Sequence, residues 1–496
     1  MILGFDDYAP DEQWQTDAVI VGSGAGGAAV AAALVERGLS VVILEQGSHW
    51  RPQEFKQDSV WAYRNLYADF GARATVGNTV IPVPGGRGVG GSTLINSAIC
   101  FRTPDEVMRH WSSDLGCVHM DSTSFSEKLD RVWRTIGVTV NPISVQRKNN
   151  LMFRRGSENL GLNGDWMPRS APGCGGCGVC QLGCPTGAKW SVDRTFLAEA
   201  LRTERCVVRS NCRVEEVTTQ GGRAISLQGD TINPMTWKPE GRFSIKAETI
   251  VISAGPVGSP RFLLANGLAS PDVTGRHLYL HPAAGMIARF DEEIRAWDGV
   301  TQGYYVDRWD HGYLLQTYVT TPDQTYASLP SILGTKAAQV VKDLAFMGMA
   351  GPLLHDEDSV GRVTPHTMTY MLGDNDRVTM LKALRECAQV FFAAGAKEVI
   401  PPIAGVGVID SPHRVDELIS LGIPARRIYL YASHPMGTCR MGTDPDTSVV
   451  SPEGLVWGWD NLYVADASVF PTSLGVNPQV TTMGIGLMVG EIAGPR

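Results

Sequence analysis

The sequence predicts an α/β fold in which one parallel β-sheet is assembled from segments far apart in the chain, with a second domain inserted between them. Three short apolar runs support the sheet: residues 17–21, 249–253 and 462–465 lie near the start, in the middle and near the end of the 496-residue chain. Short runs of this kind are typical of strands that are buried on both faces. From about residue 281 to 429, longer alternating segments and an amphipathic stretch at 378–394 indicate a second domain with an antiparallel sheet.

Composition and charge narrow the class of protein. Hydrophobic residues make up 43% of the chain and charged residues 19%, a balance that excludes a disordered chain. The net charge of −8 disfavours a nucleic-acid partner, because such binding needs clustered positive charge. No apolar run reaches the roughly 18 residues of a membrane span, so no transmembrane segment is expected. The N-terminus lacks the basic and apolar regions of a secretory signal, and we therefore expect a cytoplasmic protein.

The first apolar run opens a strand–turn–helix–strand unit. It is followed by GSGAGG at residues 22–27, an alanine-rich helical stretch at 28–37, and a second apolar run at 41–44 that ends in Glu45. A GxGxxG pattern is weak evidence alone, but here the preceding strand, the following helix and the acidic residue are all present. A glycine-rich turn without a ligand is the alternative, and this context disfavours it. The unit therefore predicts a dinucleotide site.

Each residue of this unit has a physical role in such a site. Gly22 permits the tight turn, and Gly24 lets the backbone before Ala25 approach a pyrophosphate at the positive end of the helix. Gly27 lets the helix pack closely on the sheet, and Glu45 is placed to accept hydrogen bonds from a ribose. A second glycine cluster, GGRGVGGSTLIN at residues 85–96, suits a backbone pressed against a flat ligand.

Four blocks of this sequence resemble the glucose–methanol–choline (GMC) oxidoreductases, which are FAD-dependent alcohol oxidases and dehydrogenases. The first is GSGAGG with its acidic residue, and the second is the cluster at 85–96. The third is GPVGSPRFLLANGL at 255–268, and the fourth is SHPMGTCRMG at 433–442 with LYVADASVFPTSLGVNPQVTTMGIG at 462–486. The run HLYLHP at 277–282 and a cysteine-rich segment are most similar to the long-chain alcohol oxidase branch.

The resemblance implies a Rossmann-like FAD-binding domain built from separated segments and an inserted substrate domain. It places residues 1–110, 190–275 and 430–496 in the FAD-binding domain and 276–429 in the substrate-binding domain. Residues 111–189 would form a connecting segment that carries the cysteine-rich loop.

The resemblance also implies the site residues. His434 would be the base and Asn477 would orient the substrate hydroxyl, beside the flavin ring. Histidine suits this task because its ordinary pKa of about 6.5 lies near neutral pH. Asp466 would contact the ribityl or pyrophosphate part of FAD, and Val214 the adenine. The full set expected at the cofactor is Gly22, Gly24, Ala25, Gly27, Glu45, Gly91, Ser92, Asn96, Val214, Asp466, Pro478 and Gln479.

Four of the ten cysteines lie within eleven residues, as Cys174-x2-Cys177-x2-Cys180-x3-Cys184-Pro185. This spacing equals the ferredoxin run that binds an iron–sulfur cluster, so these four are candidate metal ligands. Three alternatives stay open. They are a reduced and buried loop, a structural zinc site, and one or two disulfides.

The expected function is FAD-dependent oxidation of an alcohol, apolar or long-chain, to an aldehyde or ketone. A cluster near the flavin would pass electrons singly to a quinone or redox protein, whereas without one oxygen is a further acceptor. One alternative is an FAD and iron–sulfur sugar or glycoside dehydrogenase. A second, from another class, is an electron-transfer or redox-sensing flavoprotein.

Overall fold

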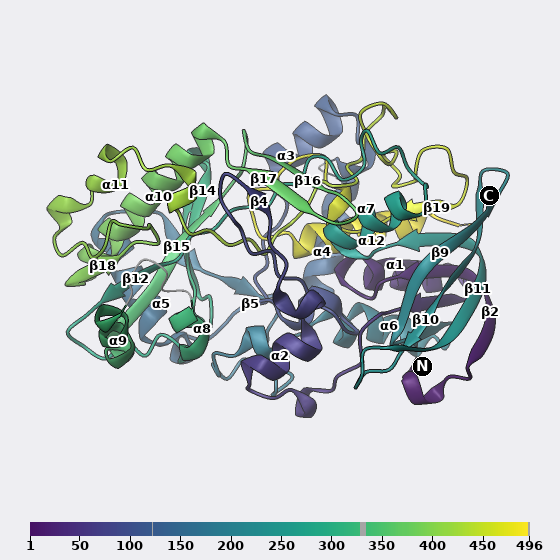
Figure 1. Ribbon diagram of the computed structural model, residues 1–496, viewed down its shortest axis with the longest axis horizontal. Coiled ribbons are helices and arrows are strands. Elements are labelled where there is room, and N and C mark those ends of the chain that lie inside the picture. The colour runs from purple at the N-terminus through teal and green to yellow at the C-terminus, as the bar shows by residue number, and fades with distance from the viewer. Residues whose placement is uncertain (122, 328–333, 495–496) are drawn as a thin grey trace.

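Strands from the start, middle and end of the chain meet in one sheet, as the three apolar runs predict. The structure, a computed structural model, describes residues 1–121, 123–327 and 334–494. In this part of the chain, an eight-stranded sheet lies on the right of Figure 1, and its neighbours from β1 to β3 to β2 to β11 run parallel. The order is β1 (Ile2–Leu3), β8 (Cys206–Arg209), β3 (Val41–Leu44), β2 (Asp11–Val21), β11 (Pro239–Ile252), β10 (Arg223–Ile232) and β9 (Cys212–Gln220), with β19 (Leu462–Val464) also pairing β11.

Two of the predicted strands are longer in the structure than their apolar runs. β2 begins six residues before the run at 17–21, and β11 begins ten residues before the run at 249–253. In both strands the first half alternates between exposed and more buried side chains, whereas the last four residues are all buried. The apolar runs therefore mark only those strand ends that are covered on both faces.

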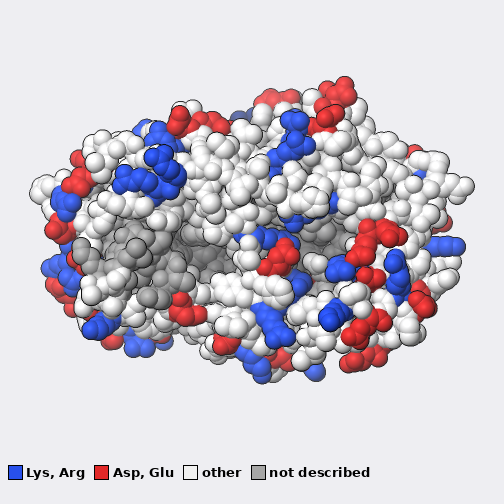
Figure 2. Space-filling view, viewed as in Figure 1, with Lys and Arg blue, Asp and Glu red and all other residues white. Residues whose placement is uncertain are grey.

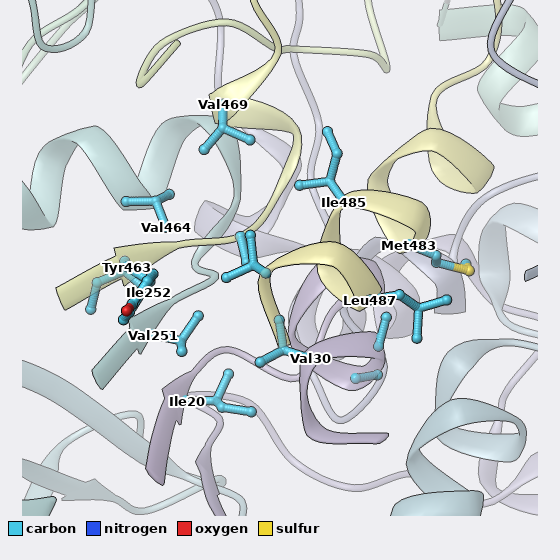
Figure 3. Close-up of a cluster of buried hydrophobic side chains, with 14 of the residues drawn as sticks. Ile20, Val30, Val251, Ile252, Tyr463, Val464, Val469, Met483, Ile485 and Leu487 are labelled. Atoms are coloured by element: carbon cyan, nitrogen blue, oxygen red, sulfur yellow. The ribbon is translucent and has the colours of Figure 1, made fainter. Parts of the chain in front are cut away.

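Two helices from segments far apart in the chain pack together beside the parallel strands. α1 (Ala25–Glu36) follows β2 and packs against the strands, and α12 (Gln479–Ile492) is the last helix of the described chain and packs against α1. In Figure 3, Val30 of α1 lies next to Ile20 of the sheet and faces α12, which carries Leu487. All three side chains are fully buried. The start and the end of the chain thus share one core, which fixes the C-terminal segment against the first strand–helix unit.

The second sheet is antiparallel, as predicted, and lies on the left of Figure 1. One strand, β6 (Gly164–Trp166), comes from the predicted connecting segment and pairs with β13. The helices α10 (Asp374–Ala393) and α5 (Ile143–Asn159) pack against this sheet. The strand order among the described residues is β18 (Glu398–Ile400), β12 (Met286–Arg289), β15 (Met347–Leu354), β14 (Tyr313–Thr317), β13 (Tyr304–Arg308) and β6.

The α/β fold class with a Rossmann-like unit and a separate antiparallel sheet is confirmed, whereas the domain boundaries stay a prediction. The remaining helices are α2 (Ser59–Leu66), α3 (Asp105–Arg109), α4 (Ser124–Thr135), α6 (Phe196–Arg202), α7 (Gly255–Ala265), α8 (Pro322–Ala327), α9 (Thr335–Lys342) and α11 (Glu417–Ser420). The remaining strands are β4 (Val76–Gly77), β16 (Val360–Val363) and β17 (Met368–Met371) in one small sheet, and β5 (Thr139–Val140) and β7 (Pro168–Arg169) in another.

The surface mixes the two signs of charge. On the face shown in Figure 2, acidic and basic side chains are interspersed among uncharged ones. Among the described residues, no helix has both the length and the apolar character that crossing a bilayer requires.

Candidate functional site

The glycine loop at residues 22–27 joins the carboxyl end of β2 to α1. Gly22 has a φ of +99°, and a side chain there would also meet the carbonyl of Ser253 in the neighbouring β11–α7 connection. Its N–H donates to the carbonyl of Leu44 at 2.8 Å, which ties the turn to β3. Glycine is therefore required here by backbone geometry and by space together.

The start of α1 presents free backbone donors. Gly24 is the N-cap, and the first helical hydrogen bond runs from the Ala28 N–H to the Gly24 carbonyl at 3.0 Å. Among the described residues, the N–H groups of Ala25, Gly26 and Gly27 have no hydrogen-bond acceptor. Three unpaired donors at the positive end of a helix form a site for an anion such as a pyrophosphate. This part of the predicted FAD site fits the cofactor.

Glu45 lies directly after β3 and is 5% exposed. One carboxylate oxygen accepts from the Ser23 hydroxyl at 2.7 Å and the Ser23 N–H at 3.2 Å. The other accepts from the N–H groups of Gly47 at 2.9 Å and Gly88 at 3.2 Å. Burial raises the pKa of Glu45, and these hydrogen bonds oppose that rise. The carboxylate thus joins the two glycine-rich loops, and its position fits the ribose contact predicted for it.

The second glycine cluster lies against the first. A side chain at Gly91, which has a φ of +54°, would come within 2.8 Å of the Gly24 Cα. Ser92 Oγ accepts from the Gly86 N–H at 2.9 Å, which holds the loop closed on itself. Asn96 Nδ2 donates to Gln479 Oε1 at 2.9 Å, so this loop also contacts the beginning of α12.

The other predicted cofactor residues lie at neighbouring positions. Asp466 follows β19 and accepts from the Gly255 N–H at 2.9 Å and the Ser259 hydroxyl at 2.6 Å, and burial raises its pKa. Val214 lies on β9, two residues after Cys212, whose N–H donates to the carbonyl of Glu45 at 2.8 Å. The loops that follow β2, β3, β11 and β19 thus meet at the carboxyl edge of the parallel strands, where open α/β sheets bind ligands.

The two residues predicted to carry the chemistry are in contact. His434 Nε2 lies 3.2 Å from Asn477 Nδ2, although the residues are 43 positions apart. Asn477 is 7% exposed and precedes Pro478, the N-cap of α12, so the packing of that helix positions it. An amide nitrogen only donates, so the imidazole nitrogen that faces it acts as the acceptor.

The surroundings of His434 favour its neutral form. Burial lowers the pKa of His434 to about 4. The ring of His281 meets it edge-on, with 5.5 Å between centroids, and His281 is itself fully buried with a pKa far below its usual value. His281 Nε2 accepts from the Gly475 N–H at 2.8 Å, which holds the loop before Asn477. At neutral pH His434 therefore has an unprotonated nitrogen available.

The sulfurs of the cysteine-rich loop do not form a metal-binding group among the described residues. In the described parts of the chain, no group of three or more His, Cys, Asp or Glu side chains is placed to hold a metal ion, and all ten cysteines are free. Arg169, which is fully buried, donates to the sulfurs of Cys174 at 3.7 Å and Cys180 at 3.3 Å. Cys184 accepts from the Lys189 N–H at 3.3 Å, and Cys177 is exposed. This arrangement does not fit an iron–sulfur cluster or a zinc ion, so the metal prediction has no structural support.

The cysteine loop nevertheless adjoins the second glycine cluster. Lys189 is 3% exposed, and its ammonium group donates to the carbonyls of Leu94 at 2.7 Å, Asn96 at 2.9 Å and Cys180 at 3.0 Å. The three carbonyls satisfy all three donors of the ammonium group. Lys189 therefore fixes the cysteine loop against the loop that is predicted to face the flavin.

A surface cavity of about 460 Å³ lies elsewhere, lined by Thr135, Trp190, Arg194, Thr195, Glu199 and Arg202. It contains none of the predicted site residues. The hydrogen-bonded group around His434 and Asn477 is the stronger candidate, because it pairs a neutral imidazole acceptor with an amide donor.

Three buried polar residues at the site were not predicted from the sequence. Ser23 bonds the Glu45 carboxylate, as described above. Asp356, 1% exposed, accepts from the Leu280 N–H and the Ser473 hydroxyl, both at 2.7 Å. Gln316, on β14, donates to Asn477 Oδ1 at 3.0 Å. Only Ser23 lies inside a recognised motif, and the alternating strand around Gln316 gives no local signal of its partner.

Comparisons with known proteins show which family this chain is similar to. Two protein-family models, both described as GMC oxidoreductase, match residues 63–283 and 354–486, and a model of an NAD(P)-binding Rossmann-like domain matches residues 20–74. An uncharacterized GMC-type oxidoreductase of Mycobacterium tuberculosis is 32% identical over 484 residues, which cover 96% of this chain and 75% of the relative. A long-chain-alcohol oxidase of Arabidopsis thaliana is 29% identical over 497 residues, which cover 94% of this chain and 65% of the relative.

Solved structures are similar in fold. Pyridoxine 4-oxidase from Mesorbium loti superposes with a TM-score of 0.73 at 18% identity, covering 96% of this chain and 98% of that one. Formate oxidase of Aspergillus oryzae gives a TM-score of 0.73 at 14% identity, covering 97% and 98%. At these identities the likeness concerns the fold alone.

Proposed function

The chain belongs to the GMC oxidoreductase family, whose members bind FAD, and from this premise we propose that it oxidises the CH–OH group of an alcohol to an aldehyde or ketone. The contact between His434 Nε2 and Asn477 Nδ2 at 3.2 Å is the observation that carries the proposal. It pairs a neutral imidazole acceptor with an amide donor, which is the combination that an alcohol hydroxyl needs.

An alcohol hydroxyl can take the place of this direct contact. Its oxygen would accept from Asn477 Nδ2, and its proton would pass to His434 Nε2. Loss of that proton makes the carbon–hydrogen bond easier to break, and a positioned general base is worth about 10²–10⁴-fold in rate. When bound, FAD would supply the acceptor for the hydride from the alcohol carbon.

The residues that would hold FAD are those at the carboxyl edge of the parallel strands. The free N–H groups at the start of α1 would bind the pyrophosphate, and Glu45 the ribose. The remainder of the site would be lined by Gly91, Ser92, Asn96, Val214, Asp466, Pro478 and Gln479.

We propose an apolar or long-chain alcohol as the substrate. Support comes from the Arabidopsis relatives that are named long-chain-alcohol oxidases. Oxygen, a quinone or a redox protein would accept the electrons. No electron transfer is assigned to the cysteine loop, because its sulfurs are not assembled around a metal position.

The test mixes the purified, FAD-loaded protein with a panel of alcohols and sugars without oxygen and follows bleaching of the flavin. We expect bleaching by apolar alcohols and a fall of about 10²–10⁴-fold in its rate in His434→Ala, with FAD content unchanged. His366→Ala, at an exposed histidine, is the matched control. Unchanged bleaching in His434→Ala would show that another group is the base, and bleaching by sugars alone would favour a sugar dehydrogenase. Iron and sulfide analysis of the same sample tests the cysteine loop.

A further inference from the structure

Gln316 connects the antiparallel sheet to the proposed reaction site. It lies on β14, where its backbone pairs with Tyr305 of β13 and Gly351 of β15, and it is 5% exposed. Its side-chain nitrogen donates to Asn477 Oδ1 at 3.0 Å. His434 and Asn477 both belong to the C-terminal part of the chain, so Gln316 is a contact that reaches them from the other sheet.

The hydrogen bonds form a chain with one direction. Gln302 Nε2 donates to Gln316 Oε1 at 3.5 Å, a long contact, and Gln316 donates in turn to Asn477. Because an amide oxygen only accepts, Asn477 must then present its nitrogen to His434. His434 Nδ1 has no partner in the described structure, so no second hydrogen bond selects the tautomer of this ring. The donor-to-acceptor direction of these hydrogen bonds is therefore the feature that leaves a lone pair on His434 Nε2.

We infer that Gln316 is a positioning residue that holds Asn477 with its amide nitrogen toward His434, so that Nε2 can accept the proton of the substrate. This inference rests on the proposed function, because it assigns a task to the base and to the amide that faces it. If the Asn477 amide were reversed, its oxygen would face His434 and favour a proton on Nε2. An alcohol hydroxyl could then neither accept from Asn477 nor donate to His434.

Two substitutions of similar size separate positioning from packing. In Gln316→Glu, the carboxylate can only accept, so it draws the nitrogen of Asn477 toward itself and reverses the amide. In Gln316→Met, the side chain fills the same space but imposes no direction. We expect Gln316→Glu to lower kcat by about 10²-fold at pH 7 and to move the acidic limb of the pH profile upward. We expect Gln316→Met to lower kcat by about 3–10-fold without moving that limb.

A second readout does not depend on turnover. Diethyl pyrocarbonate acylates an unprotonated imidazole nitrogen, and mass spectrometry can measure its rate at the peptide that contains His434. Because Nδ1 of His434 is shielded, this rate reports on Nε2. We expect the rate to fall at least about tenfold in Gln316→Glu and to change little in Gln316→Met, in line with the loss of the free lone pair.

Controls keep the test decisive. Gln228→Glu makes the same chemical change on β10, where the Gln228 side chain donates to Thr218 and Ser226, and should leave kcat and labelling unchanged. Flavin content and the unfolding midpoint show whether each variant folds. If Gln316→Glu does not fold, Gln302→Glu replaces it. A carboxylate at position 302 would draw the side-chain nitrogen of Gln316 toward itself, so that Gln316 would present its oxygen to Asn477. The Asn477 amide would then be reversed, as in Gln316→Glu.

The outcomes distinguish this inference from the proposed function. Equal effects of Glu and Met at position 316 on the pH profile, or unchanged labelling of His434 in Gln316→Glu, would overturn the role of Gln316. Full activity of His434→Ala would overturn the proposed function itself. Loss of activity in His434→Ala together with the contrast between Glu and Met supports both.

Discussion

Replacing Asn477 with Asp should raise the pKa of His434, because the imidazole would then face a carboxylate. The substitution changes one nitrogen to oxygen and places a negative charge where Asn477 Nδ2 now lies, 3.2 Å from His434 Nε2. The new carboxylate can still accept from Gln316. The packing of the site is therefore preserved, and the change acts on proton affinity.

The size of the effect follows from the distance. Two unit charges 3.2 Å apart attract by about 5 kcal/mol at an effective dielectric constant of about 20. Because one pKa unit corresponds to about 1.4 kcal/mol, this is an upper bound of about 4 units. His434 is partly exposed, so solvent screening reduces the shift, and we expect about 2–3 units. The pKa of His434, about 4 in the native protein, should then lie between about 6 and 7.

The assay is the pH dependence of kcat/KM with the alcohol that bleaches the flavin fastest. The native profile should be flat from pH 8 to about 5 and fall toward pH 4, because solvent protonates His434, and so removes the base, only near its pKa. In Asn477→Asp the fall should begin near pH 7. An acidic limb that stays near pH 4 in a variant that retains FAD would refute the reasoning, since it would mean that His434 does not control the profile. Asn375→Asp, at an exposed position at the start of α10, is the matched control.

Three further predictions concern stability and cofactor binding. His281 is buried and neutral when folded but binds a proton below about pH 6.5 when unfolded, so stability should fall on acidification. His281→Gln should reduce that slope by up to about 1.4 kcal/mol per pH unit in urea titrations, and an unchanged slope would contradict it. Gly91→Ala should displace the loop from Gly24 and lower FAD content at least about tenfold, measured by absorbance, with normal loading as the contrary result. Arg169→Met should lower the free energy of unfolding by about 2–5 kcal/mol, because it removes the donors to the Ser97 backbone carbonyl and to Asn141 Oδ1, and native stability in urea would disprove this.

Much of the fold was predictable because its signals are local. The run at residues 41–44 is β3 in full, and the amphipathic stretch at 378–394 lies almost wholly within α10. The helix after the glycine loop begins three residues earlier than the alanine-rich stretch predicts, since Ala25, Gly26 and Gly27 already form its first turn. Glycine is a poor helix former, so tertiary packing decides this boundary.

The site was predictable only where motifs mark it. His434 and Asn477 lie in recognisable segments, and the structure places them together. Gln316 lies 161 positions before Asn477 on an alternating strand, where no pattern tells which polar residue turns inward to a partner. The cysteine spacing, conversely, predicts ligands but not the positions of their sulfurs. Arg169 lies five residues before Cys174, and its place between two sulfurs depends on the packing of the whole loop.

The pairing of β2 with β11, and of β11 with β19, has a consequence for how the protein is made. As the nascent chain leaves the ribosome, the face of α1 that packs on α12 stays uncovered until α12 (Gln479–Ile492) has been synthesised. Contacts so far apart in sequence close late and fold slowly. A chain that stops short would lack both this cover and Asn477, so release of an incomplete product exposes an aggregation-prone surface without yielding a partly active enzyme.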